Sequence, residues 1–230
     1  NYGRSRVRLI KVARDIDRHE IQNLSIDIAL EGDFDAIHKE GDNSLCLPTD
    51  TMKNTVYALA GETREIEEVE AFGIRLASYL LTNNEQVRRV RLNLAEHGWK
   101  RIKVEDGEHD HSFVRGSAEK RVALIDSTRE NTTVQSGVED LIVLKTTRSG
   151  FAGFPRDKYT TLPEATDRIF STAIKAVWRY ETPRAATDHV FHAIRQTIIE
   201  IFAAHDSLSV QHTLYAMGEA VLEQFAEVVE

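Results

Sequence analysis

The sequence is poor in cysteine, proline, glycine and long apolar runs. Its 230 residues include one cysteine, Cys46, with four prolines and 12 glycines. A single cysteine excludes an internal disulfide framework and a zinc site built from cysteines. So few prolines and glycines argue against long linkers. Because the apolar runs fall far short of a membrane span and no signal peptide is visible, we expect no membrane partner and a reducing compartment.

Positive charge is also in deficit. Lysine and arginine total 29 against 37 aspartates and glutamates, which gives a formal net charge of −8. This balance argues against nucleic acid or an anionic membrane as the main partner. It does not argue against a small anionic ligand, because one buried arginine can dominate its own pocket. With 41% hydrophobic residues the chain can bury a sizeable core, as one large domain or two small ones.

Hydrophobic periodicity in the first half predicts strands and helices in the order strand, strand, helix, helix, strand, strand. The predicted strands cover 6–13, 23–30 and 90–94, with probable strand and loop over 101–115, and the predicted helices cover 49–60 and 66–80. Thr49 or Asp50 is expected to cap the first of these helices.

The second half begins in the same way. Strands are predicted around Val122 and Leu124, which share one face, and over 141–147 and 174–180, followed by helices over 190–202 and 210–225. This order predicts an α+β protein, an antiparallel sheet with helices on one face, built as a tandem repeat with halves 1–118 and 119–230. No strand pair follows the last helix. Folded proteins avoid an open sheet edge, so we expect further residues after Glu230 in the full protein.

Several possible sites carry little signal. His109 and His111 share a face if they lie on a strand and could hold a metal, but the third ligand is missing, so we expect local backbone hydrogen bonds and no metal. The carboxylates crowded over 31–50 are expected to be solvated. The sequence contains neither a glycine-rich phosphate loop nor a hydrolase nucleophile elbow.

The segment 145–168 is more informative. It combines hydroxyl groups with aromatic and guanidinium side chains such as Phe151, Tyr159 and Arg168 in a connection between strands. A flat polar heterocycle is recognised by such groups, because its ring stacks on an aromatic face and an arginine binds adjacent acceptors. The alternative is an ordered loop pinned by its own aromatics, and composition alone favours this alternative.

Eight short motifs, in family order from Tyr2 to about Phe225, resemble those of urate oxidase (uricase). They are Tyr2-Gly3, Gly41-Asp42-Asn43-Ser44, Thr49-Asp50-Thr51-Met52-Lys53-Asn54-Thr55, His109-Asp110-His111-Ser112-Phe113, Val143-Leu144-Lys145-Thr146-Thr147, Ser149-Gly150-Phe151 with Asp167-Arg168, Tyr159-Thr160-Thr161-Leu162, and Ser209-Val210-Gln211. The family has tandem tunnelling-fold (T-fold) halves, each of two strands, two helices and two strands. The resemblance therefore implies the same architecture here.

The resemblance also implies an activity: the oxidation of urate by dioxygen to 5-hydroxyisourate and hydrogen peroxide, with no metal, flavin or other cofactor. It implies a homotetramer with sites shared between subunits. By motif match, Phe151 stacks on the purine, Arg168 binds one edge, and Gln211 with the backbone of Val210 binds the opposite edge. Thr49 and Asp50 of the neighbouring subunit supply a backbone amide and the hydroxyl of a proton relay.

Two departures from the family concern the relay. Arg4 stands where the family has a lysine, and arginine stays protonated at physiological pH. Lys11 matches a different family position. The family's Asn-Lys-His run would fall after Glu230, so its His is not present in this chain. The alternative is therefore a purine-binding homologue that is impaired or inactive because of Arg4.

A third interpretation is an enzyme of the pterin or GTP branch of the same fold. Such an enzyme would need a zinc or a dedicated glutamate anchor, and Phe151 with Arg168 and Gln211 fits urate better. We expect a cytoplasmic protein if the source is bacterial and a peroxisomal one if it is eukaryotic.

Overall fold

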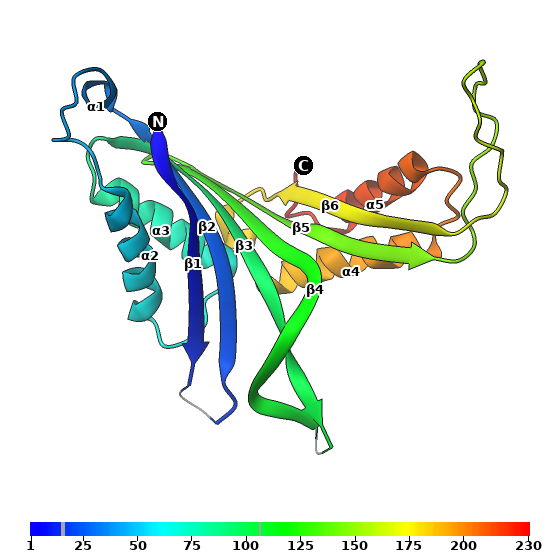
Figure 1. Ribbon diagram of the computed structural model, residues 1–230, viewed down its shortest axis with the longest axis horizontal. Helices are drawn as coiled ribbons and strands as arrows, with labels where there is room; N and C mark the ends of the chain where they lie inside the picture. Colours follow the sequence, from blue (N-terminus) through cyan, green and yellow to red (C-terminus); the bar gives the residue numbers. More distant parts are fainter. Residues whose placement is uncertain (15–16, 106) are drawn as a thin grey trace.

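A computed structural model describes residues 1–14, 17–105 and 107–230. It contains one six-stranded antiparallel sheet whose strands follow each other in chain order, each paired with the next (Figure 1). The strands are β1 (Tyr2–Ala13), β2 (Glu20–Gly32), β3 (Val87–Val104), β4 (Gly107–Thr128), β5 (Thr132–Lys145) and β6 (Phe170–Arg179).

The longer helices lie on one side of the sheet in Figure 1, with one pair near β1 and the other near β6. The helices are α1 (Asp35–Lys39), α2 (Thr49–Glu62), α3 (Val69–Thr82), the short 3₁₀ helix η1 (Pro183–Ala185), α4 (Asp188–Ala204) and α5 (Val210–Gln224). The predicted α+β architecture, an antiparallel sheet with helices on one face, is confirmed. None of the helices among the described residues is long and apolar enough to cross a membrane.

The strand β2 shows why the two-residue period predicted the sheet well. Leu24, Ile26, Ile28 and Leu30 are buried, and the side chains between them are less so, because successive side chains of a strand point to opposite faces. β1 pairs with β2 as the predicted hairpin.

The helix α3 packs very close to the sheet. A Cβ atom on Gly73 would lie 2.8 Å from a side-chain carbon of Ile125 on β4, so only glycine fits there without displacement. Leu76, Leu80 and Phe72 of the same helix are buried against the sheet.

The two residues that predicted β4 lie together on one face of the strand, and this is not the face that meets the main hydrophobic core. Ala123 and Ile125 belong to the hydrophobic core, whereas Val122 and Leu124 point to the other face of the sheet. Val122 is itself almost fully buried. Because Val122 and Ala123 are successive, buried and apolar, the strand shows no clear alternation of apolar and polar residues here.

β5 begins at Thr132, well before the predicted start at residue 141. Its register shifts between Val138 and Leu141, where Asp140 has a φ of 57°. This bulge changes the face on which the following side chains lie, so no single two-residue period runs through the strand. Ser136 and Gly137 further weaken the signal before the bulge.

The predicted cap of α2 was also wrong. The N-cap position is occupied by Pro48, without a side-chain hydrogen bond, and Thr49 and Asp50 are the first helical residues. The carboxylate of Asp50 instead accepts hydrogen bonds from Lys53 (2.5 Å) and Asn54 (2.9 Å).

The division into halves 1–118 and 119–230 stays a prediction, since the proposed boundary falls inside the continuous strand β4. After α5, Val228 forms an antiparallel bridge with Tyr180, and the amide of Arg179 donates to the carbonyl of Glu230 (2.8 Å). The last residues of the chain thus lie beside the end of β6.

A buried ionic network joins the two helix pairs. Arg121 of β4 binds both carboxylate oxygens of Glu70 at the start of α3, at 3.2 and 2.5 Å, and also binds Asp188 at the start of α4 (2.5 Å). The Ser136 hydroxyl donates to Glu70, which is completely buried. The Arg121 guanidinium lies 4.2 Å from the ring centroid of Phe191 on α4.

Candidate functional site

The predicted site residues fall into two groups, one at each edge of the sheet. Arg4, Thr49 and Asp50 lie at the β1 end, whereas Phe151 and Arg168 lie at the far end of β5 and β6 (Figure 1). β1 and β6 are five interstrand spacings apart, which is roughly 24 Å at about 4.8 Å per spacing. This distance is far greater than the width of a purine, so the structure of one chain does not bring the groups together.

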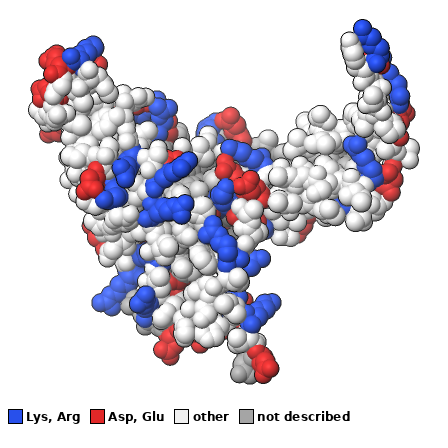
Figure 2. All heavy atoms as spheres, in the orientation of Figure 1, with Lys and Arg blue, Asp and Glu red and all other residues white. Residues whose placement is uncertain are grey.

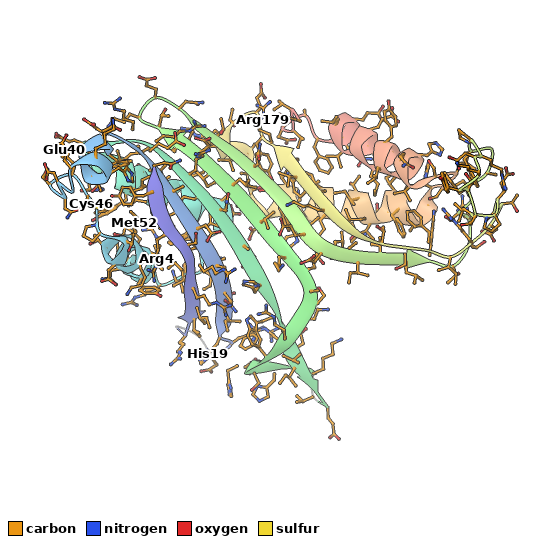
Figure 3. The ribbon with its side chains drawn as sticks, turned by 45° about the horizontal axis from the view of Figure 1, so that its top comes forward. Arg4, His19, Glu40, Cys46, Met52 and Arg179 are labelled. Carbon is orange, nitrogen blue, oxygen red and sulfur yellow. The ribbon has the colours of Figure 1, made fainter. Side chains whose placement is uncertain are left out.

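The first group is formed by β1 and the start of α2. Figure 3 shows Arg4 on β1 beside the helix that carries Met52. The side chain of Arg4 is exposed, and the chain bulges just after it, where Arg6 has a φ of 57° and its amide donates to Asp27 (2.7 Å). This bulge separates the first three pairs of β1 from the rest of the strand.

Positive charge surrounds Asp50 in this group. The hydrogen bond and charge of Lys53 lower the pKa of the Asp50 carboxyl, and the charge of Arg4 adds to this effect. Arg4 therefore contributes, to a lesser degree than Lys53, to the positive charge acting on the Asp50 carboxyl. The amides of Thr49 and Asp50 lie in the first turn of α2, where a helix leaves N–H groups without intrahelical partners.

Lys11 lies at the other end of α2. Its ammonium donates to the Thr63 hydroxyl (2.5 Å), directly after the helix ends. A helix of this length is about 20 Å long at 1.5 Å per residue, so Lys11 cannot reach the hydroxyl of Thr49.

The second group is held by a small network of backbone hydrogen bonds. Phe151 and Ala165 pair in both directions, at 2.7 and 3.0 Å, and the amide of Arg168 donates to Ser149 (2.7 Å). These bonds place the guanidinium of Arg168 5.6 Å from the ring centroid of Phe151. The stacking face and the guanidinium expected from the sequence are thus brought together.

The start of α5 completes this group. Val210 and Gln211 are its first two residues, and the Ser209 side chain caps the helix by accepting from the amide of His212 (3.1 Å). The Phe151 segment is tied to this start because the amide of Gly150 donates to the carbonyl of Ser207 (2.7 Å). Unpaired amides and the helix dipole make such a start favourable for an anion.

Sequence reasoning missed one aromatic partner. Phe154 stacks on Phe151 with ring centroids 4.8 Å apart and an interplanar angle of 12°. The guanidinium of Arg156 lies over the other ring of this pair, 5.3 Å from the Phe154 centroid. The i, i+3 spacing of the two phenylalanines was the available signal, but in an irregular segment this spacing does not specify a contact.

Charge of both signs is spread over the visible face of the molecule. Figure 2 shows lysine and arginine side chains over the middle of the sheet and along the projecting segment near α5, despite the net charge of −8.

The histidines considered as metal ligands lie near the tip of the β3–β4 hairpin. The rings of His109 and His111 meet edge to face at 4.5 Å, and the ring of His19 lies 5.8 Å from that of His111. Within residues 1–14, 17–105 and 107–230, no group of three or more His, Cys, Asp or Glu side chains has a geometry that could hold a metal.

Comparison with known proteins gives consistent results. The family model described as Uricase matches residues 1–126 and 134–230. The chain is 42% identical to a uricase of Arthrobacter globiformis, covering all of this chain and 74% of that protein, and 38% identical to a uricase of Danio rerio, covering all of this chain and 78% of that protein. The crystal structure of the Arthrobacter globiformis uricase superposes with a TM-score of 0.92 at 43% identity, covering 99% of this chain and 77% of that one.

Proposed function

The chain belongs to the uricase family, and we propose that two copies of it form each active site by joining the two groups of residues described above. The T-fold implied by the sequence motifs is confirmed, and the protein is a urate oxidase. Its reaction balances as urate, dioxygen and water giving 5-hydroxyisourate and hydrogen peroxide. The distribution of residues between the copies and the role of each residue are the proposal.

The observation that carries this proposal is the separation of the two groups. Phe151 and Arg168 lie next to each other, and Thr49 begins α2 beside Asp50, whose carboxyl is affected by the charge of Arg4, but the two groups are at opposite edges of one sheet. A two-fold axis between two chains would place the first group of each chain against the second group of the other. A tetramer made from two such pairs gives four equivalent sites.

In each site, the second group holds the purine. The Phe151 ring offers a stacking face, and the Arg168 guanidinium can donate two parallel hydrogen bonds to adjacent acceptors on one edge. The Gln211 side chain and the Val210 amide bind the opposite edge at the positive end of the α5 dipole. These contacts fix the plane, the rotation and the charge of the bound urate.

The first group, from the other copy, acts on protons. The Thr49 hydroxyl is a donor and an acceptor and can pass a proton between the substrate and solvent. Asp50 contributes its backbone amide at the start of α2, because its carboxylate is engaged with Lys53 and Asn54. Arg4 supplies positive charge that stabilises the urate anion but keeps its own proton.

Subunit complementation tests the sharing of sites. We expect Thr49→Ala and Arg168→Ala each to abolish most turnover, measured as the loss of urate absorbance and the release of peroxide. In a mixed pair, one site carries both changes and the other carries neither. Random exchange makes half of the pairs mixed, so about a quarter of wild-type activity should return.

A matched control uses two changes in the same group. Mixing Arg168→Ala with Gln211→Ala should restore nothing, since every site then keeps a defective purine-binding group. Subunit exchange is checked in both mixtures by co-purification of differently tagged chains. Exchange without recovery in the first mixture would refute the shared site, and unchanged urate affinity in Arg168→Ala would refute the assigned pocket.

A further inference from the structure

A polar cluster of two buried hydroxyl groups and one partly buried lysine is joined to the second group by backbone hydrogen bonds and has no role in the chemistry described above. Lys145, the last residue of β5, donates from its ammonium to the Ser207 hydroxyl and to the His205 carbonyl, both at 2.6 Å. The Thr213 hydroxyl, in the first turns of α5, donates to the same Ser207 oxygen at 2.6 Å. Ser207 and Thr213 are each only 1% exposed.

We propose that Lys145, Ser207 and Thr213 are positioning residues for urate, which set the start of α5 relative to the segment that carries Phe151 and Arg168. This inference rests on the proposed purine site, and it assigns to the three residues a role in the geometry of that site. They are 62 and 68 positions apart in the chain from Lys145, so their meeting depends on the fold.

Ser207 is the centre of the arrangement because it binds in two directions. Its main chain accepts from Gly150 (2.7 Å) and donates to Arg148 (2.9 Å), and it bridges Ser149 in parallel. Ser149 in turn accepts from the amide of Arg168 (2.7 Å). The backbone of Ser207 therefore holds the segment around Ser149 and Gly150, which positions the stacking ring and the guanidinium.

The side chain of Ser207 faces α5 and β5 at the same time. Its bond with Thr213 fixes the first turns of the helix, and therefore the amide of Val210 and the side chain of Gln211, to the same residue. Its bond with Lys145 fixes both to the end of the sheet. A displacement at Ser207 would thus change the distance between the two edges that bind the purine.

A lysine suits this place for physical reasons. Its ammonium lies near the C-terminus of α4, where the His205 carbonyl has no intrahelical partner and the dipole favours a cation. It also lies 5.9 and 5.4 Å from the ring centroids of Phe170 and Phe202. Burial lowers the pKa of Lys145, and the nearby Arg148 acts in the same direction.

The test compares Lys145→Met with Lys145→Arg and Thr213→Val. Methionine keeps an unbranched apolar stem over the two rings but removes the donors, arginine restores donors, and valine replaces the hydroxyl at similar volume. Urate affinity is measured without dioxygen, where no turnover occurs, and KM and kcat are measured in air. The exposed Lys39→Met on α1 is the matched control, and its activity should not change.

We expect Lys145→Met to raise both KM and the anaerobic dissociation constant for urate at least about tenfold, since small displacements of a bound substrate have large effects. Thr213→Val should move both in the same direction, and Lys145→Arg should recover part of the loss. A merely structural role would reduce the amount of active protein, which lowers kcat per total protein but leaves KM unchanged.

Two results would overturn the positioning role: wild-type KM and urate affinity in Lys145→Met, or a lower melting temperature with unchanged KM. Arg168→Ala separates this failure from failure of the proposed site. If Arg168→Ala loses urate and Lys145→Met does not, only the positioning role is wrong. If Arg168→Ala binds urate as the wild type does, the purine site itself is wrong.

Discussion

The buried pair Glu70–Arg121 allows a stability prediction in which the structure sets the magnitude. Replacing Glu70 with Gln keeps the shape of the side chain but removes its charge. In this variant the Arg121 side chain, which is 8% exposed, keeps an ion pair only with Asp188 among its two carboxylate partners. Breaking a buried pair by removing one partner costs about 3–5 kcal/mol. The Gln amide can also no longer accept at both oxygens from Arg121 and Ser136.

The Asp188 partner reduces this cost, because its bond to Arg121 at 2.5 Å remains. Its side chain is 50% exposed, however, so solvent screens it. We therefore expect Glu70→Gln to destabilise by about 3–4 kcal/mol. For a chain of this size, that corresponds to a fall of roughly 6–16 °C in melting temperature. Thermal unfolding followed by far-ultraviolet circular dichroism measures it, at one fixed protein concentration for all variants.

A double variant tests the reasoning further. Glu70→Leu with Arg121→Met removes both charges, and we expect it to be much less destabilised than the sum of the single changes, because neither charge of the pair is left without its partner. Asp35→Asn breaks the exposed Asp35–Lys39 pair and should change the melting temperature by no more than about 2 °C. A Glu70→Gln protein that melts within this range of the wild type would refute the argument.

Two further predictions concern catalysis and pH. Arg4→Lys should raise kcat at least about tenfold, since a lysine can exchange a proton. A positioned proton-transfer group accelerates a reaction by a factor of roughly 10²–10⁴. A lower kcat would show that Arg4 is not at the relay position. Burial raises the pKa of Glu96. At pH values just above the ordinary glutamate pKa, the folded state therefore binds more protons than the unfolded state. Stability then falls as the pH rises through that range. Glu96→Gln should therefore melt above the wild type at pH 7 and lose this advantage below about pH 4, and an equal difference at both pH values would contradict the assignment.

Where one face of an element is buried and the other is not, the sequence predicted the structure well. β2 and α3 are examples, since the positions of Leu24 and Ile26, or of Phe72 and Leu76, follow the period of the element. The prediction failed at β5, where the bulge at Asp140 interrupts the period. A bulge depends on pairing with β6, which local sequence does not specify.

The buried polar residues were the least predictable. From the sequence, Glu70 in the first turn of a helix is expected to be a solvated carboxylate that interacts favourably with the helix dipole. Only the fold brings Arg121 to it, from 51 positions away in the chain. Lys145 and Ser207 meet across 62 positions in the same way. The residues proposed to contact the purine came from short motifs shared with a family, whereas the residues proposed to hold them in place have partners distant in sequence.

The proposed sharing of the site between two chains would couple assembly to catalysis. On the face of β5 away from the helices, Ile142 and Leu144 are 67% and 59% exposed, next to the segment that carries Phe151. Apolar side chains in such a cluster favour contact with another protein surface. A second copy that covers them would also bring its own Thr49 toward Arg168. Burial of this surface and completion of the site would then be a single event, so separated subunits would bind purine weakly and transfer no proton, even though each chain retains its fold.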